Sequence, residues 1–384
     1  MKGKIVFVSH VASLSGAPIL LLNLLTYLKS KIPYEFIVVL QVDGPIRARF
    51  EEICPVIVYS EIKTSGRSAR LLHRLRVNEA INSRRLRQVF ALDNVKLIFS
   101  NTIANGELVD SINFSKVPVV TYVHELAYAM QALGQVTVQK ALHQTTGFLA
   151  GSGAVQQELM RIGVAADKVR VIPSSVPYVS LSAQLSTIDT VAERAKLGIG
   201  LNQHVVVAAG TAEWRKGSDL FVQMAAIIAS KPQMDTHFIW VGGNRGSIEH
   251  FQMQYDIDRM GLSQRVHILA VTPDYLKYIA LADVFVLTSR EDPFPLVILE
   301  AAVASKPIVC FANSGGSPEF IGTENGVVVS YSDVNELAET VVLLLSDSEL
   351  RAQKGNNAHT LVREHYDTSV MATQIGYAIE QYVK

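Results

Sequence analysis

Two carboxylates in the second half of the chain, Asp292 and Glu300, have a spacing and a setting that suit ligand binding. A β-branched run over residues 284–287 predicts a buried strand, and a proline-constrained turn leads into an apolar helix that begins near Pro295. Glu300 falls little more than one turn inside that helix, where an unpaired carboxylate is costly and needs a partner. Helical side chains lean toward the N-terminus, so Glu300 points at the mouth of a crevice, where it could accept from vicinal ribose hydroxyls. The alternative is a glutamate that only complements the helix dipole.

A cationic pair, Arg215 and Lys216, follows another predicted strand at residues 205–209 and precedes Gly217. Arginine offers a planar fork and lysine a point charge, so the pair suits a phosphate; a solvated turn is the equally open alternative. The glycine-rich stretch at residues 241–246 closes the next strand, and Gly242 could approach the same nucleotide. This stretch does not match the G-x-G-x-x-G fingerprint of dinucleotide-binding proteins.

Two features of the first half occupy equivalent places. Gly16 lies in a turn that opens into a helix over residues 19–29, and the free N–H groups of a helix N-terminus attract anions. His124 ends a predicted strand at residues 119–123. An ordinary strand-to-helix connection and a structural histidine are the simpler interpretations, and no second histidine follows at zinc-protease spacing.

Asp256 and Asp258 resemble the metal-binding Asp-x-Asp of some sugar transferases, but they lie in a helical pattern ahead of Gly261. We therefore expect a solvated helix face and no metal site. Cys54 and Cys310 are far apart in apolar stretches and are expected to be reduced, as in a cytosolic protein.

The elements that must position these residues alternate throughout the chain. Short apolar β-branched runs separated by helical patterns are typical of parallel sheets covered on both faces. At 384 residues the chain exceeds one comfortable core, so the fold class is α/β with two doubly wound, Rossmann-like domains facing across a cleft. We predict an N-terminal domain over residues 1–177, a linker over 178–190, a C-terminal domain over 191–365, and a final helix over 366–384 that packs back on the first domain.

The net charge of the whole chain is zero, but the two halves of the chain carry opposite net charges. Residues 1–185 hold 20 Lys and Arg against 12 Asp and Glu, a net charge of +8, and the remainder has −8. Much of the positive excess lies in one basic run, which comprises Lys63, Arg67, Arg70, Arg74, Arg76, Arg84, Arg85 and Arg87. This run could be a solvated helix face or a contact with anionic lipid or an anionic glycan carrier, and both interpretations remain open. The chain begins directly with a strand-like segment, so we expect no signal peptide, and no apolar run approaches the roughly 20 residues of a membrane span.

Together these motifs resemble family 4 of the retaining glycosyltransferases, which have the GT-B fold. The resemblance covers nearly the whole chain and is most specific over residues 292–309, with the family's acidic pair separated by seven residues, its alanine-rich helix and the next strand. It implies that Glu300 binds the nucleotide ribose, that Asp292 contacts the transferred sugar, with Glu291 as a substitute, and that His124 reaches the donor sugar.

The resemblance also assigns the rest of the donor site. Lys216 matches the family's phosphate-binding lysine, Arg215 takes the place of an arginine that is Thr211 here, and Gly16 matches one glycine of a Gly-Gly loop whose other position is Ser15. The backbone amides near the phosphate and sugar would come from Phe294, Leu296 and Val297, on either side of Pro295. The turn that contacts the base would come from Ala270 and Val271.

The implied reaction transfers a sugar, of hexosyl type, from a nucleoside diphosphate with retention of configuration and without a metal or other cofactor. The first domain would select a glycan or lipid-linked acceptor, with Asn101 and Thr102 as weaker candidates. We expect a role in cell-surface polysaccharide synthesis, in the cytoplasm or at the inner membrane face, and no nucleic-acid partner. A nucleotide-sugar epimerase and a non-catalytic nucleotide- or sugar-binding protein are the alternatives, and the missing glycine fingerprint disfavours a dinucleotide oxidoreductase.

Overall fold

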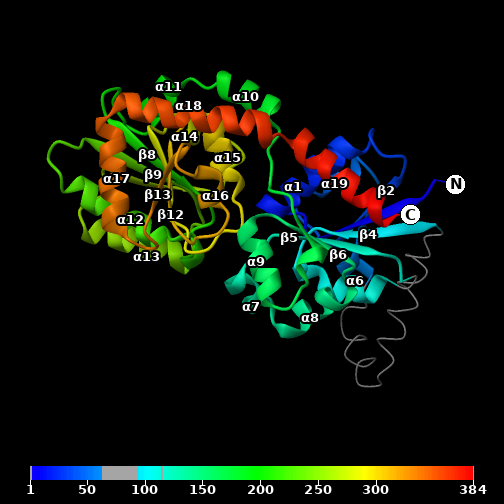
Figure 1. Cartoon of the computed structure of the whole chain (residues 1–384). Coiled ribbons are helices and arrows are strands. Elements are labelled where there is room, and N and C mark those ends of the chain that lie inside the picture. The colour runs from blue at the N-terminus through cyan, green and yellow to red at the C-terminus, as the bar shows by residue number, and fades with distance from the viewer. Residues whose placement is uncertain (1, 63–93, 114–115, 384) are drawn as a thin grey trace. The chain divides into compact units, whose positions relative to one another are not determined.

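The computed structural model describes residues 2–62, 94–113 and 116–383 of the chain. They form two compact units, the first made of Met1–Pro173 with Thr368–Lys384 and the second of Ser174–Asp367 (Figure 1). Each unit has its own sheet and its own core. Among the described residues, no helix is long and apolar enough to cross a membrane.

The first unit is built on a parallel sheet with seven strands in its described part, in the order β3-β2-β1-β4-β5-β6-β7. The strands are β1 (Lys4–Val11), β2 (Glu35–Val42), β3 (Val56–Val58), β4 (Val95–Ser100), β5 (Val119–Val123), β6 (Gly147–Ala150) and β7 (Val169–Val171). The helices are α1 (Gly16–Leu28), α2 (Arg47–Glu51), α3 (Tyr59–Ile62), α6 (Gly106–Ile112), α7 (Ala127–Leu133), α8 (Gln135–Gln144), α9 (Gly153–Arg161) and α19 (Thr368–Tyr382), with short 3₁₀ helices η1 (Ile103–Asn105) and η2 (Ala166–Lys168).

Both faces of this sheet are covered, as strand β1 illustrates. Consecutive side chains of a strand point to opposite faces. Val6 and Val8 join a cluster with residues of α6, whereas the ring of Phe7 lies 5.1 Å from that of Phe36 and 5.4 Å from that of Phe99, between centroids. Burial on both faces explains why the strand is a continuous apolar run rather than an alternating one.

Helix α19 belongs to the first unit although it follows the whole second unit along the chain. It lies against α1, where the hydroxyls of Tyr27 and Thr373 are 3.3 Å apart and Gly376 leaves room for Leu28. The sequence predicted a helix over residues 366–384, and the structure has it from Thr368 to Tyr382.

Residues 178–190, predicted to be a linker, contain helix α10 (Tyr178–Ser186). Leu181 of this helix is buried in the core of the second unit. Asp189 caps the next helix, α11 (Thr190–Lys196), by accepting from the N–H groups of Val191 and Ala192 at 3.1 and 3.0 Å. The polar residues that suggested a linker thus end and begin helices, and the second unit starts at Ser174.

The second unit is built on a parallel sheet of six strands in the order β10-β9-β8-β11-β12-β13. The strands are β8 (His204–Ala209), β9 (Thr236–Gly243), β10 (Val266–Ala270), β11 (Val284–Leu287), β12 (Ile308–Phe311) and β13 (Gly326–Val329). Besides α10 and α11, the helices are η3 (Trp214–Lys216), α12 (Ser218–Ala229), α13 (Ile248–Arg259), α14 (Leu276–Leu281), α15 (Leu296–Val303), α16 (Ser317–Ile321), α17 (Val334–Ser346) and α18 (Ser348–His365).

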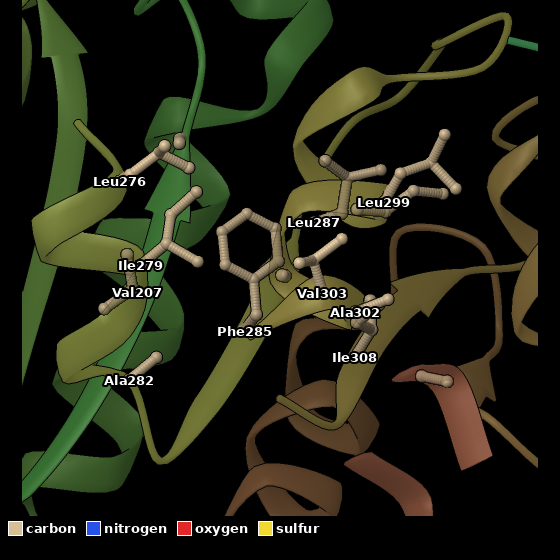
Figure 2. Packing of buried hydrophobic residues seen from close by; sticks show 14 of the residues in the cluster. Val207, Leu276, Ile279, Ala282, Phe285, Leu287, Leu299, Ala302, Val303 and Ile308 are labelled. Carbon is tan, nitrogen blue, oxygen red and sulfur yellow. The ribbon is translucent and has the colours of Figure 1, made fainter. Parts of the chain in front are cut away.

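Two helical layers sandwich this sheet. On one face Val206 and Ala208 of β8 pack under α12, α13 and α17. On the other face Val207 and Phe285 pack with α14 and α15, and Figure 2 shows Ile279, Leu287 and Val303 beside the Phe285 ring. The α/β class with two doubly wound, Rossmann-like sheets is therefore confirmed.

In both sheets the chain reverses the direction in which it adds strands. The reversal falls between β1 and β4 in the first unit and between β8 and β11 in the second. In open α/β sheets, ligands bind in the crevice outside the carboxyl ends of the strands at such a switch point.

Candidate active site

The switch point of the second unit joins the loop after β8 to the loop after β11. The Thr288 hydroxyl donates to the Lys216 carbonyl at 3.1 Å, and the Arg290 N–H donates to the Arg215 carbonyl at 2.8 Å. The two sequence motifs singled out in this half, which are 76 residues apart at Lys216 and Asp292, therefore form one local structure.

Lys216 and Asp292 form an ion pair at this point. The Lys216 Nζ donates to Asp292 Oδ2, and the exposed fractions of the two side chains are 17% and 5%. The lysine predicted to bind phosphate and the carboxylate predicted to contact the sugar are thus in direct contact. Each compensates the charge of the other in a setting where an unpaired charge would be costly.

Arg215 has a different set of partners. Its guanidinium donates to the Glu291 carbonyl at 3.0 Å and forms an ion pair with Glu213 at 2.9 Å. It therefore helps to hold the 291–292 turn. The carbonyl of Glu291 is one of its acceptors, which places Glu291 at the same turn as Asp292.

Two glycines allow the loops to meet this closely. Gly217 has φ +68°, and a Cβ there would lie 1.9 Å from the Thr288 carbonyl oxygen. Gly242, at the end of β9, has φ +121°, and a Cβ would lie 2.2 Å from the Gly210 carbonyl oxygen, which also accepts from the Trp240 indole at 3.1 Å. A side chain at either position would separate the strands' carboxyl ends.

The N-terminus of α15 lies directly after Asp292. Pro295 is the N-cap residue, so the N–H groups of Leu296 and Val297 are in the first turn and have no acceptor within the helix. The Phe294 side chain is buried, and its ring stacks on that of Tyr366 with centroids 5.7 Å apart. The loop over residues 314–316 packs on the same turn, because the Asp292 N–H donates to the Ser314 carbonyl at 2.6 Å.

Glu300 is buried in α15, with 6% of its surface exposed. Its Oε1 accepts from the Tyr275 hydroxyl at 2.5 Å, whereas Oε2 has no hydrogen-bond partner among the described residues. Burial raises the pKa of Glu300 to about 7, and the bond from Tyr275 acts in the opposite direction. One oxygen of this buried side chain therefore has no donor in the part of the chain that the structure describes.

Tyr275 was not predicted from the sequence. The sequence indicated that a buried Glu300 needs a hydrogen-bond partner, but it did not indicate which residue would supply it. Reasoning also missed Arg290, which binds both Asp219 oxygens at 2.8 and 2.7 Å and lies over the Trp214 ring. Val271, predicted near the base, lies exposed just after Ala270, the last residue of β10.

The first unit has its own polar cluster at the carboxyl ends of β4 and β5. Glu125 is half-buried and accepts from the Thr102 hydroxyl and from the N–H groups of His124 and Ile103, at 2.9 and 3.3 Å for the two N–H groups. The His124 ring lies against Tyr122, and its buried Nε2 has no partner among the described residues. Burial lowers the pKa of His124 to about 3, so the imidazole is neutral.

Asn101 connects this cluster to the Gly16 turn. The Asn101 amide donates to the Ala17 carbonyl at 2.7 Å, and its Oδ1 is buried without a partner among the described residues. Gly16 is the first residue of α1, and Ser15 precedes it as N-cap. The helix begins three residues earlier than predicted. Asn101, Thr102, His124 and Gly16 thus lie around the switch point of the first sheet.

The remaining predicted features lie elsewhere. Asp256 and Asp258 are on α13, where Asp258 Oδ1 accepts from Gln254 at 2.9 Å and from Ser263 at 2.8 Å. The described residues contain no group of three or more His, Cys, Asp or Glu that could hold a metal ion. Cys54 and Cys310 are free. The basic run from Lys63 to Arg87 lies outside the described residues.

The fold and the polar switch points define a two-domain, Rossmann-like α/β protein. The model of the glycosyl transferases group 1 matches residues 189–360, and that of Glycosyltransferase Family 4 matches residues 14–178. The chain therefore belongs to the group 1, family 4 glycosyltransferases.

Similar proteins agree with this assignment. The chain is 32% identical over 179 residues to the lipopolysaccharide core biosynthesis mannosyltransferase LpcC of Rhizobium leguminosarum bv. viciae, covering 45% of this chain and 50% of that protein. It is 28% identical over 197 residues to a GDP-mannose-dependent monoacylated phosphatidylinositol monomannoside mannosyltransferase of Corynebacterium glutamicum, covering 49% and 50%. The matched stretches thus span about half the length of these relatives.

A solved structure matches over a greater length. The crystal structure of Anabaena HepE in complex with UDP and glucose has a TM-score of 0.81 and 23% identity, and covers 98% of this chain and 99% of that one. This likeness confirms the GT-B fold class.

Proposed function

We propose that the protein transfers a sugar from a nucleoside diphosphate donor to a glycan or lipid-linked acceptor, with retention of configuration, in the synthesis of a cell-surface polysaccharide. Family membership supports sugar transfer, and relatives named for lipopolysaccharide core and phosphatidylinositol mannoside synthesis support this class of acceptor.

The observation that carries the donor assignment is the buried Oε2 of Glu300, which has no hydrogen-bond partner among the described residues. A buried acceptor without a donor is costly unless a ligand satisfies it. Glu300 lies on the helix that follows β11, beside the switch point that also holds Lys216. A nucleoside diphosphate supplies both a ribose hydroxyl as donor and a phosphate as anion.

In the proposed reaction the chain stabilises charge rather than attacking the sugar. Lys216 and the first N–H groups of α15 bind the departing diphosphate, and Asp292 contacts the sugar as its anomeric carbon becomes positive. We nominate no protein nucleophile. We also propose that no metal ion is needed, because Asp256 and Asp258 lie on α13 rather than at the end of a strand.

The acceptor is proposed to bind to the first unit. Asn101 has a buried oxygen without a partner among the described residues, and it lies beside the Gly16 turn. We further propose that the protein works in the cytoplasm, at the inner membrane face, where the +8 charge of residues 1–185 attracts anionic lipid or an anionic glycan carrier.

The donor assignment is tested by calorimetric titration of the wild type and Lys216→Ala with UDP, GDP and the matching nucleosides. We expect the variant to lose about 10-fold or more in affinity for the diphosphate and little for the nucleoside, because a charge-assisted bond contributes about 1.5–3 kcal/mol. Lys196→Ala, at an exposed lysine of α11, is the control. Equal losses for diphosphate and nucleoside would remove Lys216 from the phosphate site.

A further inference from the structure

Among the described residues, Tyr275 supplies the side-chain hydrogen bond to Glu300. Tyr275 is the N-cap residue of α14, and its hydroxyl donates to Glu300 Oε1 at 2.5 Å. Burial and the neighbouring carboxylate both raise the pKa of Tyr275, so the hydroxyl stays protonated and acts as the donor. Oε1 therefore has a donor, whereas Oε2 has none among the described residues.

The backbones that carry these two side chains are fixed by the hydrophobic core. Leu276 follows Tyr275 and Leu299 precedes Glu300, and both belong to the cluster between the sheet and this helical layer (Figure 2). Leu299 has no exposed surface and Leu276 has 7%. With both helices anchored, the Tyr275 hydroxyl determines how the Glu300 carboxylate is oriented.

An anchored carboxylate offers its two oxygens unequally to a ligand. Ribose has two vicinal hydroxyls, and a carboxylate with both oxygens open could accept from both. With Oε1 engaged by Tyr275, the acceptor that lacks a donor among the described residues is the buried Oε2, which suits one hydroxyl. The two ribose hydroxyls should then contribute differently to binding.

We propose that Tyr275 is a positioning residue that holds Glu300 Oε1 and presents Oε2 to a single ribose hydroxyl of the donor nucleotide. This inference rests on the proposed function, because it requires that a nucleoside diphosphate binds here. It adds a residue that sets specificity through Glu300 without touching the nucleotide itself.

The test compares UDP or GDP, whichever the wild type binds more tightly, with its 2′-deoxy and 3′-deoxy forms. For the wild type we expect one deoxy form to bind about 10- to 150-fold more weakly and the other to bind nearly as well as the parent. Equal losses for the two deoxy forms would overturn the inference, and this arm needs no variant.

The second arm uses Tyr275→Phe, which keeps the buried ring and removes the hydroxyl. In Tyr275→Phe we expect the affinities for the two deoxy forms to differ by no more than about 3-fold. The double variant Tyr275→Phe/Glu300→Gln should lose no further discrimination between the two deoxy forms. Tyr278→Phe, three residues along in α14, is the matched control and should respond like the wild type. If folded Tyr275→Phe discriminates between the two deoxy forms as strongly as the wild type does, the inference is overturned.

The two proposals fail in different ways. If the wild type binds neither UDP nor GDP nor any related nucleoside diphosphate, the proposed function is wrong. If the wild type binds the diphosphate and Lys216→Ala weakens it, but Tyr275→Phe leaves the deoxy discrimination unchanged, only the role of Tyr275 is wrong.

Discussion

Glu300 and Asp292 are both buried carboxylates, but their surroundings give them different properties. Asp292 has a cation, Lys216, as its partner, whereas Glu300 has the neutral hydroxyl of Tyr275. Because a hydroxyl compensates a buried negative charge less well than a cation does, burial dominates at Glu300 and raises its pKa to about 7. The two residues should therefore respond differently to neutral substitution.

The first prediction concerns stability against pH. Glu300 has a pKa of about 7 in the folded protein and an ordinary value of 4.5, so the folded state binds the proton more tightly. Its contribution to the free energy of unfolding is greatest below pH 4.5, falls as pH rises to 7, and is constant above that. The fall is about 3 kcal/mol.

Glu300→Gln should remove this dependence. In urea unfolding, the free energy of the variant minus that of the wild type should rise between pH 4.5 and 7 and then level off. Glu339→Gln, at an exposed position of α17, gives the baseline. A difference that stays flat over this range would show that Glu300 is not titrating there.

The second prediction separates binding from transfer at Asp292. Asp292→Asn keeps the shape but removes the charge that compensates Lys216. Binding of the nucleoside diphosphate should stay the same or tighten, because Lys216 becomes a stronger anion partner. The kcat of sugar transfer should fall about 100-fold, since the developing positive charge on the sugar loses its carboxylate. Weakened binding with unchanged kcat would contradict the assignment.

At the scale of elements, the donor site depends on how closely the loops after β8 and β11 approach. Gly217 is the contact point, with its Cα facing the Thr288 carbonyl. The N-terminus of α15 and the ion pair are placed correctly only if this approach is kept.

The third prediction tests this approach with two glycines of similar backbone conformation. Gly217 and Gly261 have φ of +68° and +69°, but a Cβ meets backbone 1.9 Å away at Gly217 and nothing within 4 Å at Gly261. Gly261→Ala should cost about 1–2 kcal/mol of unfolding free energy, from φ alone. Gly217→Ala should cost at least about 2 kcal/mol more, measured by urea unfolding. If the two variants lose the same unfolding free energy, the loops after β8 and β11 can move apart with little loss of stability.

The fourth prediction follows from the element that carries the Asp-x-Asp pair. On α13, Asp258 already accepts from two side chains, so the pair is poorly placed to hold a divalent ion beside a diphosphate. Transfer should persist in excess EDTA at near its untreated rate. Activity abolished by EDTA and restored by Mn²⁺ would contradict the proposed metal independence.

At the scale of the whole molecule, the charge division bears on location. The fifth prediction is that the protein binds vesicles of anionic lipid weakly, binds neutral vesicles less, and is released by salt. Exposed charges are screened beyond about 10 Å at 0.1 M salt, so sedimentation with vesicles should fall steeply on raising the salt. Binding that ignores both lipid charge and salt would contradict it.

The sequence by itself determined the kind of fold. Continuous apolar strands such as residues 205–209, alternating with helical patterns, require a parallel sheet covered on both faces, and the structure has two such sheets. Local periodicity carries this information because each residue's burial depends on the face of the element it occupies. Where local composition was ambiguous, as at residues 178–190, the prediction of a linker missed helix α10.

The tertiary structure decided which groups meet. Lys216 and Asp292 are 76 residues apart and Tyr275 and Glu300 are 25 apart, and no local pattern encodes either contact. Those contacts arise because the strand order brings β8 beside β11, so that their following loops share one edge, and because α14 and α15 pack on one face of the sheet. The sequence indicated that Glu300 needs a partner, but only the packing of distant elements determined that this partner is Tyr275.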